Sequence, residues 1–307
     1  MTITHLITHS GGFHADELLS SVVLTRLFPD AQLIRTRDAA MTTPGAGKLI
    51  YDVGRAYDAE AGIFDHHQRP NPLRPSGDPY SSFGLIWHHY GRDYLRALDV
   101  PEADLEEVHG AIDQSFVLPV DLLDNGAVNP SVAGPLADIT LPQLLETLKP
   151  AFDDRSPEAD TNAFMAALPI AGAFVEAAVR AKAGKCRAEA MVLQAITAAG
   201  PSQVLELSMG MPFRSAVEKA GADHLLFVIH PRDGGDWALT TIRKGGGTFE
   251  ARADLPAAWA GLTGAALEEA SGVAGAQFCH NGLFIAVANS RAAILAMADL
   301  AVAAAAV

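Results

Sequence analysis

The chain has 307 residues and a net charge of −14 at pH 7, with 49% hydrophobic and 19% charged residues. Its composition is that of a globular protein, and its length suits two domains of ordinary size. The negative charge excludes a broad basic face that would bind nucleic acid non-specifically, although metal ions can invert the charge locally.

The cysteines and the first residues of the chain favour a cytoplasmic protein. Two cysteines, Cys186 and Cys279, are too few for a disulfide framework in a chain of this size. The opening MTITHLITHSGG lacks the basic and apolar segments of a signal peptide. No stretch reaches the length of a membrane span without charges or turn residues, so no membrane association is expected.

The first part of the chain alternates short strands with a helix. Strands are predicted at 3–8, 31–36, 48–54 and 62–67. Apolar residues at helical spacing in ADELLSSVVLTRLF predict a helix after the first strand. This order predicts an α/β domain with a mostly parallel sheet and flanking helices. Ligands of such sheets bind beyond the carboxyl ends of the strands.

The rest of the chain divides into a helical region and a second region with strands. Prolines, glycine and asparagine make 68–79 a loop. Helices are predicted to dominate 81–125 and 157–199, and then strands return, with helices near 264–271 and 290–303. We therefore expect two domains, residues 1–200 and residues 201–307, the second being a smaller α+β domain.

Histidines and acids follow three of the predicted strands. The turn in THSGGFHADE is rich in glycine, which lets the backbone bend sharply and gather side chains. The candidate ligands from THSGGFHADE, YDVG and IFDHHQRP are His9, His14, Asp16, Asp52, Asp65, His66 and His67. Each alone is more simply explained as a surface histidine, a helix cap or a turn residue. Their convergence at three strand ends indicates one site.

The chemistry of these side chains predicts a metal centre. Imidazoles and carboxylates without thiolates suit Mn²⁺, Mg²⁺, Fe²⁺ or Zn²⁺. The set holds more than four ligands, enough for two ions, and paired ions activate water and hold a phosphoryl group for in-line attack. Asp52 is our candidate for the carboxylate shared by both ions.

The triplet Asp65-His66-His67 resembles the signature of the DHH phosphoesterase superfamily, which includes RecJ-type exonucleases, oligoribonucleases and manganese pyrophosphatases. The chain is more closely similar to the Myg-type branch (the melanocyte-proliferating-gene family of predicted metal-dependent hydrolases). The motifs that carry this resemblance follow one another along nearly the whole chain. They are THSGGFHADE, LIRTRD, YDVG, FDHHQR, YSSFGLIWHHYG, PVDLLDNG, FEARADLPAAWAGL and FCHNGLF.

The resemblance implies which residues bind metal. The first motif supplies His9, His14 and Asp16, with His14 in place of an acid and with a turn one residue longer than usual. This departure bears on metal preference, because imidazole favours softer ions than carboxylate does. The bridging acid maps onto Asp52, and His66 maps onto a further ligand.

The other implied roles concern catalysis and a further acid. His67 maps onto a phosphate contact, and Asp65 onto the group that orients an imidazole, so both join Asp52 as catalytic residues. The acid of PVDLLDNG is either Asp121 or Asp124. These two residues are three apart and would share one face of a helix, so the sequence leaves both open as metal ligands.

The candidate substrate contacts lie in both domains. The resemblance implies that the second domain binds substrate through His280, although this chain lacks the glycine pair that usually follows the motif. Arg252 is a candidate phosphate partner, because guanidinium groups fit phosphate. Arg35 and Arg37 either face the site or carry plain surface charge. The run 245–247 of three glycines follows no strand-into-helix signal and is expected to be a loop rather than a phosphate cradle.

The resemblance implies a metal-dependent phosphodiesterase with a DHH-type catalytic domain and a C-terminal substrate-binding domain. It would hydrolyse RNA or short oligonucleotides from the 3′ end with two Mn²⁺ ions, Mg²⁺ and Zn²⁺ being alternatives. A small-molecule phosphohydrolase acting on a nucleotide or pyrophosphate-like compound is the second hypothesis, because three Trp and five Tyr form no clear stacking track. The third hypothesis is a metal-binding protein without catalytic activity. A homodimer is possible, and the sequence leaves the oligomeric state open.

Overall fold

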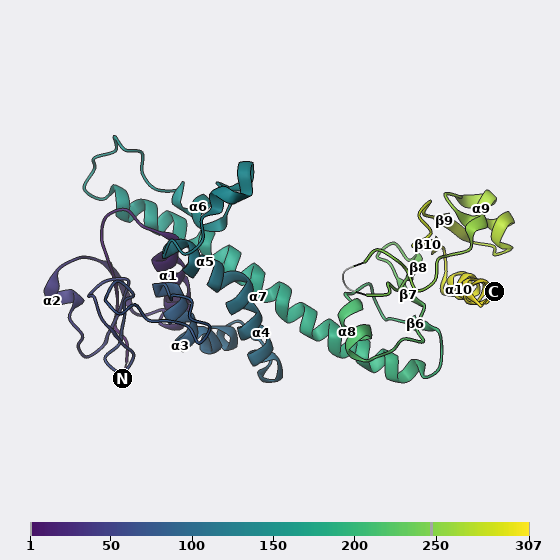
Figure 1. The fold of residues 1–307 in the computed structure, drawn as a ribbon, viewed down its shortest axis with the longest axis horizontal. Helices are drawn as coiled ribbons and strands as arrows, with labels where there is room; N and C mark the ends of the chain where they lie inside the picture. The colour runs from purple at the N-terminus through teal and green to yellow at the C-terminus, as the bar shows by residue number, and fades with distance from the viewer. Residues whose placement is uncertain (1, 246–247, 307) are drawn as a thin grey trace. The chain divides into compact units, whose positions relative to one another are not determined.

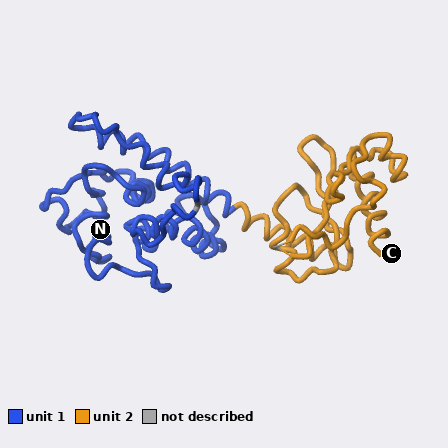
Figure 2. The backbone as a smooth tube through the Cα atoms, turned by 45° about the horizontal axis from the view of Figure 1, so that its top comes forward, with its two compact units in different colours: residues 1–183 blue, residues 184–307 orange. Residues whose placement is uncertain are grey.

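The computed structural model describes residues 2–245 and 248–306. The chain divides into two compact units, residues 1–183 and 184–307 (Figure 2). The division falls inside one long helix, α7 (Ala159–Ala199), whereas the sequence predicts a boundary at the end of that helix. Two glycines of the predicted loop, Gly246 and Gly247, lie outside the described residues.

Unit 1 is built on a five-stranded sheet in the order β2-β1-β3-β5-β4. Its strands are β1 (His5–Thr8), β2 (Gln32–Arg35), β3 (Lys48–Tyr51), β4 (Tyr57–Asp58) and β5 (Ile63–Phe64). The strands β2, β1, β3 and β5 run parallel, and the short β4 pairs antiparallel at the edge. The mostly parallel sheet is as predicted, and β4 is an addition that the sequence did not indicate.

Unit 1 also contains helices, of which α2 lies apart from the others in Figure 1. They are α1 (Ala15–Leu27), α2 (Ala39–Thr42), α3 (Ser82–Ala97), α4 (Leu105–Ile112), α5 (Leu118–Asp124) and α6 (Leu141–Glu146), with short 3-10 or π-helical turns at Glu102–Asp104, Asp113–Val117 and Pro130–Leu136. The helix α1 packs along α3 and is buried on every side from Ala15 to Leu24. A helix enclosed in this way needs no polar face, so polar residues in its first turn are buried for another reason.

The helix α7 packs one face against its surroundings. Its buried residues recur every three or four positions: Phe164, Ala167, Ala171, Val175 and Val179. The ring of Phe164 meets the ring of Phe13 edge to face, 5.4 Å between centroids, beside the first turn of α1. Among the described helices, α7 alone is long and apolar enough to cross a membrane. This is weak support for a membrane span, because the core helix of a folded domain passes the same test.

Unit 2 holds a second five-stranded sheet in the order β6-β7-β8-β10-β9. Its strands are β6 (Val204–Glu206), β7 (Phe227–Pro231), β8 (Trp237–Thr241), β9 (Ala276–Cys279) and β10 (Ile285–Ala288). Only β6 and β7 are parallel, and the remaining pairs are antiparallel. The unit is therefore a mixed α+β structure, as predicted.

Helices cover both faces of the second sheet. They are α8 (Arg214–Lys219), α9 (Gly264–Ser271) and α10 (Arg291–Ala305), with a 3-10 turn at Ala257–Trp259. The helices α9 and α10 pack on one face, and α8 with the end of α7 packs on the other. The helices α9 and α10 match the predicted ranges, whereas α8 was not predicted. Cys186 and Cys279 are both buried.

Candidate metal centre

The carboxyl ends of β1, β3 and β5 lie together at one edge of the first sheet, because the three strands are parallel neighbours. His9 comes just after β1, Asp52 directly after β3, and the triplet 65–67 directly after β5. Residues separated by more than fifty positions thus meet at one place. All of His9, Asp52, Asp65 and His66 are buried there.

Asp52 lies at the centre of this edge. Its Oδ2 is 3.2 Å from His9 Nε2, and its Oδ1 is 3.3 Å from His66 Nε2. Its backbone has a φ of 53°, in the left-handed region that Asp adopts more readily than most residues. The chain turns sharply after β3 in this way, and the carboxylate presents one oxygen to each of two imidazoles.

One set of ligand-type atoms forms around His66. The Nε2 atom of His66 lies 3.3 Å from Asp124 Oδ2 and 3.8 Å from Asp16 Oδ2. Asp16 belongs to the first turn of α1, and Asp124 is the last residue of α5. We call His66, Asp16, Asp52 and Asp124 the His66 group.

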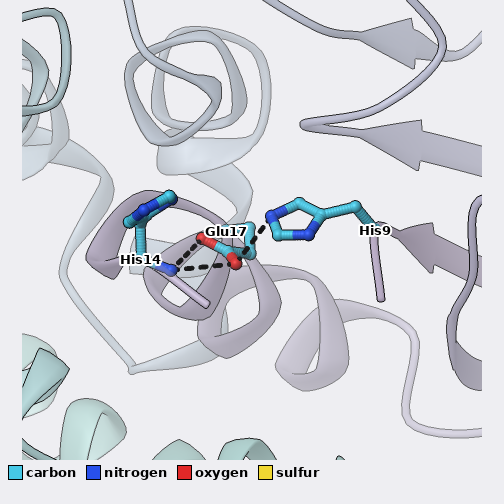
Figure 3. A group of neighbouring side chains, drawn as sticks. All are labelled: His9, His14 and Glu17. Carbon is cyan, nitrogen blue, oxygen red and sulfur yellow. Dashed lines mark hydrogen bonds and ion pairs between the residues drawn. The ribbon is translucent and has the colours of Figure 1, made fainter. Parts of the chain in front are cut away.

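A second set forms around His9. The Nε2 atom of His9 lies 2.9 Å from Glu17 Oε1. Figure 3 shows the Glu17 carboxylate between the His9 ring and the backbone amide of His14, which donates to both carboxylate oxygens at 3.0 and 2.9 Å. We call His9, Glu17 and Asp52 the His9 group, and both groups together the Asp52 cluster.

Glu17 is the site residue that sequence reasoning missed. Its side chain is fully buried. The available signal was an acid three residues after His14 at a helix start, the spacing of a capping box. That spacing indicates a helix start, but it does not tell that the acid will be enclosed beside an imidazole.

The exposed imidazole of His14 lies near both groups. Ligand atoms of His9, His14 and Glu17 lie within 4.8 Å of one another, as do those of His14, Asp16 and Asp124. His14 is therefore placed to join either group, from the solvent side.

Burial and crowding shift the pKa values of the His9 group. Burial lowers the pKa of His9, but its interactions with Asp52 and Glu17 outweigh burial and raise that pKa to about 10. Burial raises the pKa of Glu17 to about 8, against the opposing effect of His9 and with the help of the Asp16 charge. Protons therefore stay in this group at neutral pH.

The His66 group shows the same behaviour. Burial raises the pKa of Asp124 to about 9, and the Asp16 charge adds to this. Burial would raise the pKa of Asp52, but His66 and His9 lower it to about 2. Burial lowers the pKa of His66, but Asp52, with the charges of the other acids, raises it to about 10. The bound protons reduce the repulsion between neighbouring carboxylates, and a divalent cation would reduce it in the same way.

Three buried atoms of the cluster have no hydrogen-bond partner among the described residues: Asp16 Oδ1, Asp52 Oδ1 and His66 Nε2. The last two atoms are 3.3 Å apart but do not meet in hydrogen-bond geometry. Buried polar atoms are normally bonded, and each orphan costs about 1–3 kcal/mol. A coordinated cation would satisfy all three atoms. The residues of the Asp52 cluster fit a divalent metal ion, and they could bind one.

Asp65 holds His67 beside the cluster, where His67 Nδ1 lies 3.6 Å from Asp52 Oδ1. Asp65 Oδ1 lies 2.8 Å from His67 Nδ1 and accepts the backbone amides of His66 and His67 at 2.8 and 3.1 Å. Asp65 Oδ2 accepts the amide of Arg55 at 2.5 Å. The hydrogen bond from Asp65 raises the pKa of His67. The His67 side chain is 58% exposed, so an oriented imidazole faces solvent beside the cluster.

The structure distinguishes the two acids of PVDLLDNG. Asp121 Oδ2 accepts from Arg74 Nη2 at 2.6 Å and from Nε at 2.9 Å. Asp121 Oδ1 accepts the hydroxyl of Ser81 at 2.6 Å and the amide of Gly84 at 3.1 Å, at the N-terminus of α3. The prediction of Asp121 as a metal ligand is therefore corrected: its carboxylate caps a helix and pairs with an arginine, and Asp124 lies in the cluster.

The two arginines of LIRTRD differ in the same way. Arg37 Nη2 lies 3.1 Å from His9 Nδ1, so Arg37 contacts the site. Arg35 donates to the carbonyls of Gly11 at 2.5 Å and Asp160 at 2.9 Å, and it lies over the Phe164 ring. Arg35 supports the glycine turn through these contacts, and its role as a substrate contact stays a prediction.

Two cavities border the Asp52 cluster. One is lined by residues that include His14, His66, His67, Arg69 and Asp124. The other is lined by residues that include His9, His14, Arg37, Arg55 and His67. Arg55 and Arg69 were not predicted. Cationic side chains beside an acidic metal-type site would attract an anionic ligand.

Comparison with known sequences covers almost the whole chain. Residues 5–302 match a family model for MYG1 exonucleases. Its description is "uncharacterised protein family (UPF0160)". The chain belongs to the MYG1 family. A MYG1 protein of Schizosaccharomyces pombe is 30% identical, with 92% of each chain covered. The Homo sapiens protein named MYG1 exonuclease is 30% identical, with 95% of this chain and 84% of that one covered. The Myg-type resemblance is confirmed, and the wider DHH placement stays a prediction.

In this MYG1-family chain Arg252 has a structural role in unit 2. Its Nη1 donates to the carbonyls of Ala222 at 2.7 Å and Leu225 at 2.9 Å, and its Nη2 lies 3.3 Å from Asp223 Oδ1. These partners hold the guanidinium in place, and the role of Arg252 as a phosphate partner stays a prediction.

The exposed His280 lies on the turn between β9 and β10 with two aromatic neighbours. Its ring centroid is 4.2 Å from that of Phe284 and 6.3 Å from that of Phe278. The two phenylalanines are 47% and 37% exposed, respectively. Unit 2 of this MYG1-family chain thus carries three aromatic rings at its surface. The counts of Trp and Tyr gave no sign of such a surface for base stacking, because these rings belong to Phe and His.

Proposed function

We propose that this protein is a metal-dependent nuclease, a hydrolase that shortens RNA or short oligonucleotides from the 3′ end. The observation that carries the proposal is the Asp52 carboxylate, with one oxygen beside His9 and the other beside His66. The relatives named MYG1 exonuclease support nuclease-type chemistry. A DHH-type arrangement of unit 1, with unit 2 as the substrate-binding domain, is part of this proposal.

The His9 group and the His66 group would each hold one divalent ion, with Asp52 shared between them. Each group combines one imidazole with two or more carboxylates, a donor set that suits Mn²⁺, with Mg²⁺ and Zn²⁺ as alternatives. When bound, a pair of such ions supplies Lewis acidity that lowers the pKa of water and neutralises charge on a phosphoryl group.

The surrounding side chains would bind and orient the phosphodiester. His67, held through Nδ1 by Asp65, presents its other nitrogen to the cavities and can donate a hydrogen bond to a phosphate oxygen. Arg37 and Arg55 line one of these cavities and would neutralise the substrate charge. These contacts would position the phosphorus atom beside the Asp52 cluster.

The exposed rings of unit 2 favour an oligonucleotide over a small phosphate compound. Phe278, His280 and Phe284 offer aromatic faces on which successive bases can stack without sequence preference. A small phosphate ester would need no such surface. The pockets beside the Asp52 cluster also offer His67 and arginines to a single phosphate group, so a small-molecule phosphohydrolase is the second candidate.

A turnover assay with Mn²⁺ tests the proposal. A short 5′-labelled RNA should yield a ladder of shortened products, whereas a 3′-labelled strand should release labelled mononucleotide at once. Chelation and the Asp52→Asn substitution should each abolish both signals. Turnover of pyrophosphate or dinucleotides alone would support the second candidate. Tight Mn²⁺ binding without any turnover would indicate a metal-binding protein without catalysis.

The cytoplasmic setting and the homodimer stay predictions from the sequence. Light scattering on the purified chain measures the oligomeric state directly, and a monomer at working concentrations would contradict the dimer.

A further inference from the structure

A shallow pocket at the surface of unit 2 gathers four cationic side chains. Its lining includes Arg214, Arg243, Lys244 and Arg252, with Glu218 as the acid. Two of these cations are already matched, because Lys244 pairs with Glu250, and Arg252 is held by carbonyl groups and an aspartate.

The other two, Arg214 and Arg243, have no carboxylate partner among the described residues. Arg214 is the first residue of α8, and Arg243 lies two residues beyond β8. Burial lowers the pKa of Arg214, and the like charge of Arg243 lowers it further. The chain has 36 acidic and 22 basic residues, so acids are in excess. Two neighbouring guanidinium groups left unpaired in such a chain indicate an anionic ligand.

An exposed aromatic ring adjoins the pair. The guanidinium carbon of Arg243 lies 4.5 Å from the centroid of Phe249, a cation–π contact that restrains the arginine. Phe249 is 89% exposed, so most of its ring is free for another contact. A guanidinium and an open ring side by side match a phosphate and a base that are neighbours along a strand.

We propose that Arg214 and Arg243 bind a backbone phosphate of a single-stranded nucleic acid and that Phe249 stacks on an adjacent base. The inference rests on the proposed function, because it assigns to unit 2 a grip on the same substrate. Two unpaired cations against Glu218 leave one net positive charge, which matches the single charge of a phosphodiester. A free phosphate or a terminal phosphate carries more negative charge and would meet the Glu218 carboxylate less favourably.

The test measures binding of a fluorescent single-stranded RNA to the full chain in EDTA, so that no cleavage occurs. The double variant Arg214→Ala/Arg243→Ala should bind at least ~10-fold more weakly and show a shallower salt dependence, with the slope reduced by ~1–2. Phe249→Ala should weaken binding and leave the salt slope unchanged. Arg187→Ala is the matched control, since Arg187 is an exposed arginine on α7 in the same unit.

Three outcomes would overturn the inference. The double variant could bind RNA like the unmodified chain, or Arg187→Ala could weaken binding as much as the double variant does. Inorganic phosphate or a mononucleotide could displace the RNA at equal charge concentration, which would assign the pocket to a free phosphate. The variant Arg214→Lys/Arg243→Lys guards against a folding artefact: it should keep the salt slope and lose affinity, because lysine lacks the planar fork.

RNA binding by Arg214 and Arg243 and hydrolysis at the Asp52 cluster are tested by separate measurements, so either can fail while the other holds. Binding in EDTA does not depend on hydrolysis, and hydrolysis is measured on the unmodified chain with Mn²⁺. A chain that binds RNA through Arg214 and Arg243 but hydrolyses no substrate would support the inference and remove the proposed function.

Discussion

In unit 1 the strands β2, β1, β3 and β5 run parallel, whereas in unit 2 only β6 and β7 do. All four carboxyl ends of the first sheet therefore lie at one edge, and the residues that follow β1, β3 and β5 meet there. The antiparallel strands of the second sheet end alternately at opposite edges. A parallel sheet can thus gather short side chains such as Asp52 and Asp16 into one cluster. In the mixed sheet of unit 2, the charged pocket is instead formed by the long side chains of Arg214, from a helix, and Arg243, from a loop.

The charges of the two regions differ accordingly. The Asp52 cluster holds four acids, three of them buried, for two imidazoles, so it would attract cations. The pocket of Arg214 and Arg243 holds two arginines without a carboxylate partner among the described residues, so it would attract an anion. The buried cluster is sensitive to protonation and to single substitutions, whereas the pocket at the surface should respond mainly to salt.

The largest expected effect comes from Asp52→Asn, which removes the carboxylate that both groups share. We expect Mn²⁺ affinity and turnover to fall by at least ~100-fold, because even outer groups of metal sites contribute that much. Calorimetry with Mn²⁺ and the RNA assay measure the two losses. Asp30→Asn, at an exposed acid, is the control. Binding of two ions to the Asp52→Asn chain would show that the sheet edge does not form one site.

The next effect separates the two acids of α5. Asp121→Asn should lower the free energy of unfolding by ~3 kcal/mol, because it leaves the buried Arg74 without its main charge partner. Mn²⁺ affinity should be unchanged. Asp124→Asn should instead reduce Mn²⁺ affinity ~10–100-fold. It should not reduce stability, since burial raises the pKa of Asp124 to about 9 and its carboxyl is already protonated at neutral pH.

Urea unfolding and Mn²⁺ calorimetry on both variants test this contrast. The assignment would be reversed if Asp121→Asn removed metal binding while stability was kept.

A smaller effect is expected from pH, which should change Mn²⁺ binding in unit 1 but not RNA binding in unit 2. The pKa values of Glu17 and Asp124 are raised by burial to about 8 and about 9, so both carry protons at pH 7. Mn²⁺ must displace these protons, and its affinity should therefore rise at least ~10-fold per pH unit between pH 6 and 8. RNA binding in EDTA through Arg214 and Arg243 should not change over this range, because guanidinium groups stay charged.

Calorimetry in two buffers with different ionisation enthalpies counts the protons that Mn²⁺ releases. A Mn²⁺ affinity that is flat from pH 6 to 8 would contradict the protonated cluster.

The smallest effect concerns His109, an imidazole of unit 1 away from the sheet edge. Its ring stacks on Trp87 at 5.4 Å between centroids, and its Nε2 lies 3.2 Å from the Trp87 carbonyl. Burial lowers its pKa below the usual 6.5. His109 therefore binds a proton more readily in the unfolded chain than in the folded one. The contribution of neutral His109 to the free energy of unfolding is fully present above pH 6.5. It is lost as pH falls from 6.5 through the folded pKa.

His109→Gln should therefore lose less stability than the unmodified chain between pH 7.5 and 5.5. Thermal unfolding at both pH values measures the difference. Equal losses in the two chains would show that His109 does not titrate on unfolding.

The motifs predicted several parts of the site because they are local. The strands before His9, Asp52 and Asp65 are short apolar runs, and a ligand after each run lies at a strand end whatever the rest of the chain does. Glu17 escaped prediction because its spacing from His14 describes only a helix start. The contacts of Arg252 also escaped prediction, because its partners, the carbonyls of Ala222 and Leu225, are thirty and twenty-seven residues away.

By itself the sequence determined an α/β region with a mostly parallel sheet, a smaller α+β region after it, and the strand ends at which imidazoles and acids gather, since these depend on periodicity and on turn residues. Only the tertiary structure decided that Asp124 and not Asp121 joins the cluster, that Glu17 is enclosed there, and that aromatic rings meet in unit 2. The physical reason is that a repeat along the chain tells which residues share a face, whereas packing against distant elements decides which neighbours that face will meet.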